Sequence, residues 1–272
     1  MSKAIYKMAD LFAGCGGLSL GLEQAGFTPW FVNEIVPDYC NTYKYNHKLS
    51  DSHYFIGDIN ELNKNLNKYD KFIKGLDLVC GGPPCQGFSM ANRQRIIDDP
   101  RNQLYKAYLT FLSYAKPKFF IMENVRGMAN KYSEIMENFK EYLGEDYKFD
   151  YRLLHAQDFG VPQNRERFIM IGNRIGIDPK NIFDAIDSHK RKPFVLKDAL
   201  FGLPHLESKK QKGQSGVEDI ASGLTERDFD YPITDFYRFI NGNRKITKLY
   251  NHKNRYKNPR DIENYRKIPQ GA

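Results

Sequence analysis

One cysteine of this chain lies in a sequence that suits a reactive thiol. Cys85 follows two prolines in the segment GGPPCQGFS, just after a short apolar run that is typical of a buried strand. Proline fixes its own backbone φ, so the two prolines leave the chain little freedom to move the thiol out of position. A cysteine that only fills core space needs no such restraint. The pattern favours Cys85 as a nucleophile, whereas the other three cysteines are expected to be small packed residues: Cys15, Cys40 and Cys80.

A candidate proton donor follows another apolar run. Glu123 opens the sequence Glu-Asn-Val directly after the run 119–122, which has the composition of a strand. A nucleophilic cysteine needs such a donor for its substrate. Open α/β sheets bind ligands beyond the carboxyl ends of their strands. Cys85 and Glu123 are therefore expected to meet at one edge of a sheet.

A glycine-rich turn, DLFAGCGGL, follows the first expected strand. Glycine lets the backbone turn sharply and lets a ligand approach the start of the next helix. The spacing of Gly14, Gly16, Gly17 and Gly21 matches the dinucleotide fingerprint G-x-G-x-x-G poorly. The turn predicts a nucleotide-type pocket but disfavours an oxidoreductase that uses a dinucleotide.

Two carboxylates follow the next expected strands. Glu34 comes about 20 residues after the glycines, where a carboxylate can accept hydrogen bonds from ribose hydroxyls. Asp58, in the sequence Gly-Asp-Ile, follows a third candidate strand and could accept a hydrogen bond from an adenine amino group. Their shared placement at strand ends favours a common pocket.

The elements that must position these residues alternate along the chain. Apolar runs indicate strands, and stretches with helical spacing lie between them; strands are expected at 4–12, 30–33, 76–80, 118–122 and 167–171, and helices at 18–25 and 104–115. This alternation predicts an α/β fold with a doubly wound, mostly parallel sheet. From Ser188 onward charged and turn residues dominate. The expected domains are therefore 1–187 and a partial second domain, 188–272.

The composition narrows the class of protein. Lys and Arg total 41 against 33 Asp and Glu, a formal net charge of +8, which favours a polyanionic partner. The four cysteines lack paired metal spacing, so neither a zinc site nor a disulfide framework is expected. The N-terminal sequence lacks a signal peptide, and no apolar run reaches the length of a membrane span. A cytoplasmic protein without a metal fits these features.

Four motifs together resemble one family. DLFAGCGG, GGPPCQGFS, ENV and QNRER occur in the order and approximate spacing of the cytosine-5 DNA methyltransferases, over about residues 5–175. The resemblance implies a Rossmann-like S-adenosylmethionine-dependent methyltransferase fold and a cofactor, S-adenosylmethionine. It also implies double-stranded DNA as the partner and a place in a restriction-modification system.

The resemblance also implies roles for single residues. Cys85 would add to C6 of cytosine, which makes C5 nucleophilic enough to accept a methyl group. Glu123 would contact N3 and the amino group, and Arg165 and Arg167 would position the base and the catalytic loop. The residues implied to line the cofactor pocket are Phe12, Gly14, Gly16, Leu18, Glu34, Asp58, Ile59 and Pro83.

Cytosine in a duplex is out of reach, so the enzyme is expected to flip it out of the helix. The segment 89–101 is a plausible closing loop, and the expected nucleic-acid contacts are Gln86, Ser89, Arg93, Arg95 and Arg101. Between Phe236 and Arg260 there are eight Lys or Arg and no acid, interleaved with aromatic residues. This basic, aromatic-containing segment favours a nucleic-acid surface and resembles the start of a target-recognition region. A solvated basic face is its competitor.

The chain stops where the family continues into a variable recognition region and a closing segment. The sequence is therefore expected to be a truncated chain or a catalytic subunit whose second polypeptide carries those parts. Two alternatives stay open: a cytosine-5 methyltransferase that acts on tRNA, and a non-catalytic DNA-binding relic. The residues Gly87-Phe88-Ser89 are more typical of the DNA branch, and the retention of the four expected catalytic residues disfavours a relic.

Overall fold

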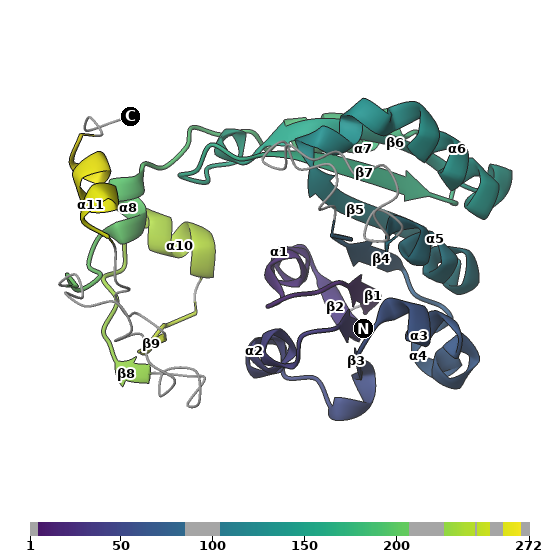
Figure 1. Ribbon diagram of the computed structural model, residues 1–272, viewed down its shortest axis with the longest axis horizontal. Helices are drawn as coiled ribbons and strands as arrows, with labels where there is room; N and C mark the ends of the chain where they lie inside the picture. The colour runs from purple at the N-terminus through teal and green to yellow at the C-terminus, as the bar shows by residue number, and fades with distance from the viewer. Residues whose placement is uncertain (1–4, 85–103, 207–225, 243, 251–257, 268–272) are drawn as a thin grey trace. The chain divides into compact units, whose positions relative to one another are not determined.

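The computed structural model describes residues 5–84, 104–206, 226–242, 244–250 and 258–267. Its backbone divides into two compact units, residues 1–193 and 194–272 (Figure 1). The division falls slightly after the expected boundary between residues 187 and 188.

The first unit is built on a seven-stranded sheet with the order β3-β2-β1-β4-β5-β7-β6 (Figure 1). The pairings among β1 to β5 are parallel, whereas β7 is antiparallel to both of its neighbours. The strands are β1 (Tyr6–Leu11), β2 (Phe27–Glu34), β3 (Tyr54–Ile56), β4 (Leu78–Gly81), β5 (Phe119–Val125), β6 (Lys148–His155) and β7 (Glu166–Asn173). The mostly parallel α/β sheet predicted from the sequence is confirmed.

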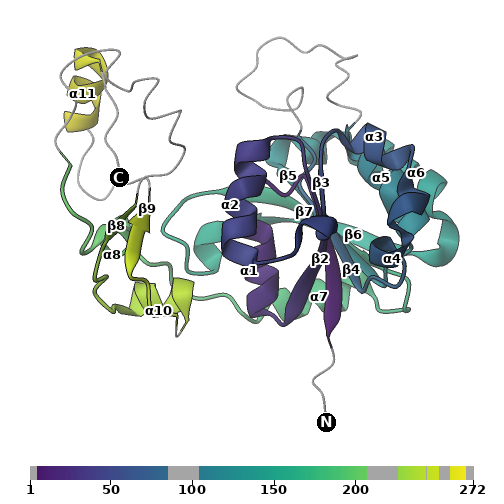
Figure 2. The same cartoon turned by 90° about the horizontal axis from the view of Figure 1, so that it is seen from below.

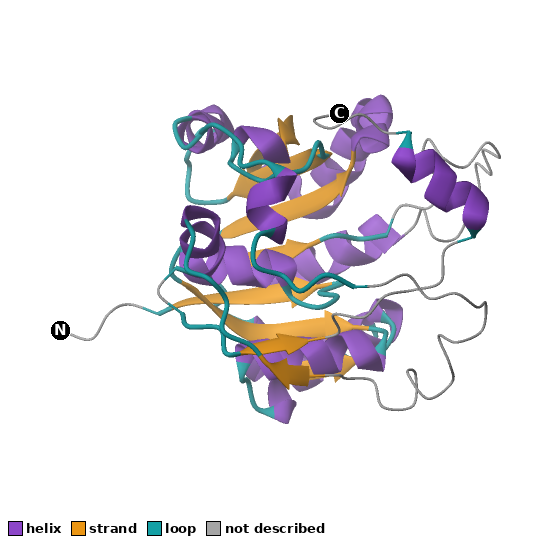
Figure 3. Cartoon of the chain, turned by 90° about the vertical axis from the view of Figure 1, so that its left-hand side faces the viewer, coloured by secondary structure: helices purple, strands orange, loops and turns teal. Residues whose placement is uncertain are grey.

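Helices cover both faces of this sheet, as Figure 2 and Figure 3 show. α1, α2 and α7 pack on one face, and α3 to α6 pack on the other around the main core. Their bounds are α1 (Gly17–Gln24), α2 (Pro37–His47), α3 (Ile59–Asn63), α4 (Asp70–Ile73), α5 (Leu104–Ala115), α6 (Tyr132–Leu143) and α7 (Pro179–Asp187).

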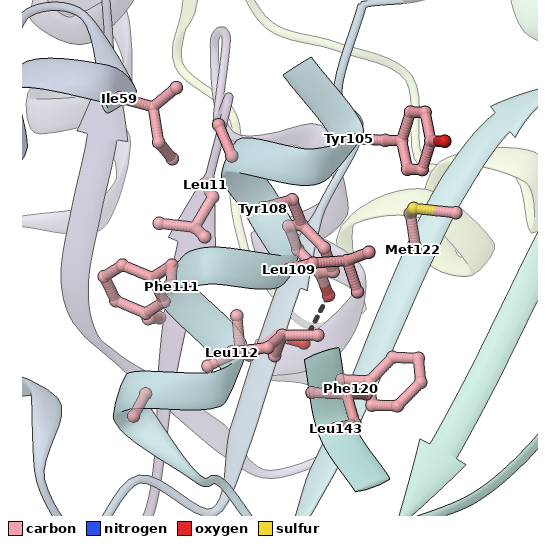
Figure 4. Packing of buried hydrophobic residues seen from close by; sticks show 14 of the residues in the cluster. Leu11, Ile59, Tyr105, Tyr108, Leu109, Phe111, Leu112, Phe120, Met122 and Leu143 are labelled. Atoms are coloured by element: carbon pink, nitrogen blue, oxygen red, sulfur yellow. Dashed lines mark hydrogen bonds between the residues drawn. The ribbon is translucent and has the colours of Figure 1, made fainter. Parts of the chain in front are cut away.

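Helix α5 supplies the centre of the main core (Figure 4). Its buried side chains repeat at helical spacing and pack against β1, β4 and β5. The hydroxyl of Tyr108 lies 3.2 Å from the Val79 carbonyl oxygen and 3.0 Å from that of Ile121. Because these carbonyls belong to β4 and β5, Tyr108 ties the strand that precedes the Cys85 segment to the strand that contains Glu123.

The structure corrects one expected strand end. The apolar run predicted that the strand stops at Met122, but β5 continues through Val125. The reason is pairing, since β7 continues alongside β5 and aligns Arg167 with Val125. Glu123 therefore lies within a strand, where side chains alternate between the two faces.

The second unit contains three helices and a two-stranded sheet among its described residues. They are α8 (Leu196–Leu200), β8 (Glu226–Asp228), α10 (Asp235–Asn241), β9 (Lys248–Tyr250) and α11 (Pro259–Arg266). Tyr237 is buried, and its hydroxyl accepts a hydrogen bond from the Ile246 amide at 2.7 Å. Phe236 and Phe239 pack against Phe194, with ring centroids 5.4 Å apart in each pair. Phe236, Tyr237 and Phe239 belong to the basic segment that was expected to form a nucleic-acid surface. The structure shows that these three side chains pack within the unit itself.

Candidate active site

One edge of the sheet brings expected catalytic residues together. β1, β2, β4 and β5 are parallel, so their carboxyl ends lie at the same edge. β7 runs in the opposite direction, so its first residues reach that edge too. Glu123, near the end of β5, and Arg167, near the start of β7, therefore become neighbours.

Glu123 and Arg167 form an ion pair. Arg167 Nε lies 2.7 Å from Glu123 Oε1, with 23% of the arginine side chain and 35% of the glutamate side chain exposed. Arg167 also donates from Nη1 to the Glu166 carbonyl oxygen at 2.8 Å. The ion pair places the positive charge of the guanidinium directly beside the carboxylate. The partial exposure leaves the carboxylate accessible to a ligand.

The segment that leads to Cys85 is anchored to the same strand. Asn124 Nδ2 donates to the Pro83 carbonyl oxygen at 3.0 Å, and both residues are buried. A Cβ on Gly82 would lie 3.0 Å from Glu123 Oε2, which is tighter than an ordinary contact. Glycine at position 82 therefore allows the Glu123 carboxylate to lie close against this segment. The importance of Asn124 was not foreseen, although its place beside Glu123 in the ENV motif was the available signal.

Several expected site residues lie outside the described part of the chain. They are the expected nucleophile Cys85 and the expected nucleic-acid contacts Gln86, Ser89, Arg93, Arg95 and Arg101. Their roles remain predictions from the sequence.

The QNRER segment presents charges on both faces of β7. Arg165 is exposed, and with Arg167 it lines an apolar pocket of about 280 Å³, whose other lining residues are Leu154, Ala156, Phe159, Ile169 and Ile186. Glu166 lies between the two arginines in the sequence. Its Oε2 forms an ion pair with Arg126 Nη1 at 3.1 Å, and its Oε1 lies 3.3 Å from His155 Nε2. The sequence reasoning did not single out Glu166. Its position between two arginines of an alternating strand was the only signal.

The glycine turn at the end of β1 has three residues with positive φ. Phe12, Gly14 and Gly16 have φ values of +57°, +55° and +88°. For a residue with a side chain, the left-handed region costs roughly 1–2 kcal/mol, so Phe12 is held there by its surroundings. The Gly14 amide donates to Glu34 Oε2 at 2.7 Å, and the Val36 amide donates to Glu34 Oε1 at 2.8 Å. The turn and the end of β2 are thus joined through one carboxylate.

The remaining expected cofactor residues differ in how far they are exposed. Leu18 is half-buried on α1 and Pro83 is buried after β4. Asp58 is exposed and caps α3, where its Oδ1 accepts from the Asn60 amide at 2.8 Å. Ile59 is 2% exposed and packs in the main core. The structure therefore shows Ile59 as a core residue, and its expected contact with a cofactor stays a prediction from the sequence.

A buried carboxyl group, Asp10, lies beneath the glycine turn. Asp10 is 1% exposed, and the Ser19 hydroxyl donates to its Oδ2 at 2.7 Å. Tyr43 in turn donates to Ser19 Oγ at 2.7 Å. Burial raises the pKa of Asp10 to about 7, against hydrogen bonds from Ser19 and Cys80 that lower it. Sequence reasoning passed over Asp10, although a carboxylate inside an apolar run is an unusual sign.

The described residues also bear on metal binding and on membrane insertion. Across the described ranges, no three His, Cys, Asp or Glu side chains gather in a way that could hold a metal ion. Among the helices of those same ranges, none combines the length and apolar character needed to span a bilayer.

Comparisons with known proteins agree with this geometry. Over residues 6–270 the chain matches the family model described as C-5 cytosine-specific DNA methylase. It is 44% identical to the type II methyltransferase M1.HphI of Haemophilus parahaemolyticus over 175 residues, which cover 61% of this chain and 45% of that protein. It is 40% identical to the type II methyltransferase M.AquIA of Picosynechococcus over 222 residues, which cover 73% of this chain and 89% of that protein.

A solved structure is also similar. It is described as a DNA modification methyltransferase encoded within a prophage of E. coli, with a TM-score of 0.66 and 32% identity. The match covers 85% of this chain and 63% of that one. The family match over nearly the whole chain, the sheet and the four motifs agree, and the chain belongs to the C-5 cytosine-specific DNA methylase family.

Proposed function

We propose that this chain carries the catalytic site of a DNA cytosine-5 methyltransferase of the type II restriction-modification kind. The observation that carries the proposal is the Glu123–Arg167 ion pair, which lies against the Gly82-Pro83 segment just ahead of Cys85. The relatives named type II methyltransferases support this class of substrate.

The proposed chemistry begins at Cys85. Its thiolate forms a bond to C6 of cytosine, and the C5–C6 electron pair becomes available at C5. The carboxyl group of Glu123, in its protonated form, donates a proton or hydrogen bond to N3 as this adduct forms, and Arg167 holds this group in place. After C5 has gained a methyl group, a base removes the C5 proton. The C5–C6 double bond then reforms and expels the thiolate.

The cofactor proposed for this reaction is S-adenosylmethionine, which supplies an electrophilic methyl group. The residues at the end of β1 and β2 fit it. Each Glu34 oxygen accepts one backbone hydrogen bond, and a carboxylate has about four acceptor positions, so ribose hydroxyls can still bind. Gly14 carries no side chain that would obstruct a ligand at the turn, and a Cβ at this position would meet open space.

Duplex DNA is the proposed partner, and the target base leaves the helix to reach this edge of the sheet. Arg165 is exposed beside the pocket and is proposed to position the base or the catalytic loop. The basic side chains of the second unit include Arg238 and Lys248, which pair with Asp235 and Asp228. Phosphate contacts of such side chains would give affinity that depends on salt.

The proposal is tested by methyl incorporation. The chain is incubated with labelled S-adenosylmethionine and with either duplexes covering many short sequence contexts or bulk tRNA. A candidate second polypeptide is present in half of the reactions. Label at cytosine C5 of DNA, absent in Cys85→Ser, is the expected result. Label in tRNA alone would replace DNA by tRNA as the substrate, and no label under any condition would contradict the assignment.

A further inference from the structure

The end of α2 packs directly against the glycine turn. His47, its last residue, has a side chain that is only 2% exposed, and its Nδ1 lies 2.7 Å from Glu23 Oε2 on α1. Tyr43 lies one turn earlier, also buried, with ring centroids of the two residues 4.2 Å apart. These two rings form one surface, called here the α2 wall.

The α2 wall lies over Gly16, the N-cap residue of α1. A Cβ built on Gly16 would lie 2.3 Å from His47 Nε2 and 2.8 Å from both His47 Cδ2 and Tyr43 Cδ2. Real Cβ atoms never approach ring atoms so closely, so the wall occupies the space that any side chain at position 16 would need. Gly16 also has a φ of +88°, which other residues rarely adopt.

Both residues of the wall are fixed by contacts of their own. Glu23 sets the orientation of the imidazole ring, and Tyr43 donates to Ser19, which donates to Asp10 on β1. A displacement of either ring therefore breaks a hydrogen bond or ion pair that is largely shielded from water. The wall is rigid relative to both α1 and β1.

The position of Gly16 is linked to the proposed ligand site. The Gly16 amide donates to the Ala13 carbonyl oxygen at 3.0 Å, and the intervening Gly14 donates to Glu34. If the wall receded, Gly16 could move, and the Gly14 amide and Glu34 would lose their fixed geometry. A ligand would then have to order the turn at the expense of its own binding energy.

We infer that His47 and Tyr43 are positioning residues for the cofactor: they hold the glycine turn in its binding conformation from behind, without contacting the ligand. This inference rests on the proposed S-adenosylmethionine site. It assigns a function in binding to α2 residues that the four sequence motifs do not include.

Two substitutions of His47 separate its contacts. The amide of asparagine reaches the position of Nδ1, so His47→Asn keeps a partner for Glu23 but removes Cδ2 and Nε2, the atoms that face Gly16. His47→Gln reaches the Nε2 position and loses the Nδ1 contact. We expect His47→Asn to weaken S-adenosylmethionine binding by about tenfold in calorimetry on the full chain, and His47→Gln to retain more of the affinity.

A double-mutant cycle tests the contact itself. Gly16→Ala should nearly abolish binding in the wild-type background, because the methyl group meets the wall. In the His47→Asn background the added cost should be smaller, since the contact with the imidazole is gone and only the contact with Tyr43 Cδ2 and the unfavourable φ remain. Tyr43→Phe, which keeps the ring and loses the bond to Ser19, should weaken binding by roughly threefold, as for one neutral hydrogen bond, and serves if His47→Asn does not fold.

The control is Ile135→Ala on α6, a buried core residue on the opposite face of the sheet. It should lower the melting temperature at least as much as His47→Asn while leaving the affinity within about twofold of wild type, because distant sites are additive. Two results would overturn the inference but leave the cofactor proposal in place. One is wild-type affinity in both His47→Asn and Tyr43→Phe, and the other is an equal loss of affinity from Gly16→Ala in both backgrounds. Absence of binding by the wild-type chain would instead overturn the cofactor proposal, and the inference with it.

Discussion

The proposed cofactor end of the sheet and its reaction edge hold their polar groups in different ways. At the cofactor end, Asp10 and Glu34 are buried and accept hydrogen bonds from neighbouring elements. At the reaction edge, Glu123 and Arg167 are partly exposed and are joined by an ion pair. Folding completes the first site, whereas the second presents charges that a substrate can still meet. The cofactor end should therefore respond to substitution in binding and stability, and the reaction edge in rate.

The largest effect is expected at Cys85. Cys85→Ser should abolish methyl transfer, because a hydroxyl lacks the thiolate character needed to add at C6. Fold and cofactor affinity should stay close to wild type, as judged by circular dichroism and calorimetry. Turnover by the serine variant at the wild-type rate would remove Cys85 from the mechanism.

The next largest effect is expected at Glu123. Glu123→Gln keeps the side-chain volume but cannot supply the same proton, so the single-turnover rate should fall by roughly 10²–10⁴-fold. Arg167→Lys serves as a comparison, since it keeps the charge and loses the planar guanidinium beside Glu123. A single-turnover rate unchanged by Glu123→Gln would exclude the proposed acid role.

Asp10 should make stability depend on pH. Because burial raises its pKa from 3.8 to about 7, the folded chain binds more protons at this site than the unfolded chain between those values. The raised pKa therefore adds to the free energy of unfolding fully below about pH 4, and this gain is lost as the pH rises through 7. At ~1.4 kcal/mol per pKa unit, the upper limit of the gain is on the order of 4 kcal/mol.

Urea unfolding of wild type and Asp10→Asn at pH 5 and pH 8 measures this contribution. The free energy of unfolding of wild type should fall more between the two pH values than that of the asparagine variant. Equal changes in both proteins would show that Asp10 does not titrate as its burial implies. Besides burial, three groups affect the pKa of Asp10: the hydroxyl of Ser19 and the thiol of Cys80 lower it through hydrogen bonds, and the charge of Glu34 raises it.

The smallest effects are expected from the two carboxylates after β2 and β3. Glu34→Gln should weaken S-adenosylmethionine binding by about 1–3 kcal/mol, because a buried acceptor of backbone and ligand hydrogen bonds is lost. Asp58→Asn keeps an N-cap side chain for α3, so its loss of affinity isolates the ligand contact and should be at the lower end of that range. Calorimetry that shows no change for either variant would mean that the pocket is elsewhere.

The sequence predicted the fold best where apolar runs are continuous. The helix expected at 104–115 is confirmed as α5, and the apolar runs expected as strands overlap β1, β2, β4, β5 and β7. β6 was not predicted, because Lys148–His155 mixes charged and apolar residues and owes its conformation to pairing with β7. Helix α2 was missed for a similar reason, since its buried residues include Tyr43 and His47 rather than an aliphatic stripe.

The sequence assigned Glu123 and Arg167 to one candidate site, but it did not predict what holds them side by side. The meeting of Glu123 and Arg167 depends on the antiparallel direction of β7, which no local pattern in the sequence indicates. The anchoring of Pro83 by Asn124 and the network around Asp10 are long-range contacts between elements. Spacing within one motif cannot reveal them.

The central claim, that Cys85 adds to cytosine at this edge, is tested most directly with a duplex that contains 5-fluorocytosine. Fluorine at C5 cannot leave as a cation, so the adduct persists after methyl transfer and survives denaturation. We expect a complex that requires S-adenosylmethionine, with any second polypeptide that activity needs, and whose crosslinked peptide maps to Cys85. A crosslink at another residue, or no complex from a preparation that methylates normal DNA, would contradict the account.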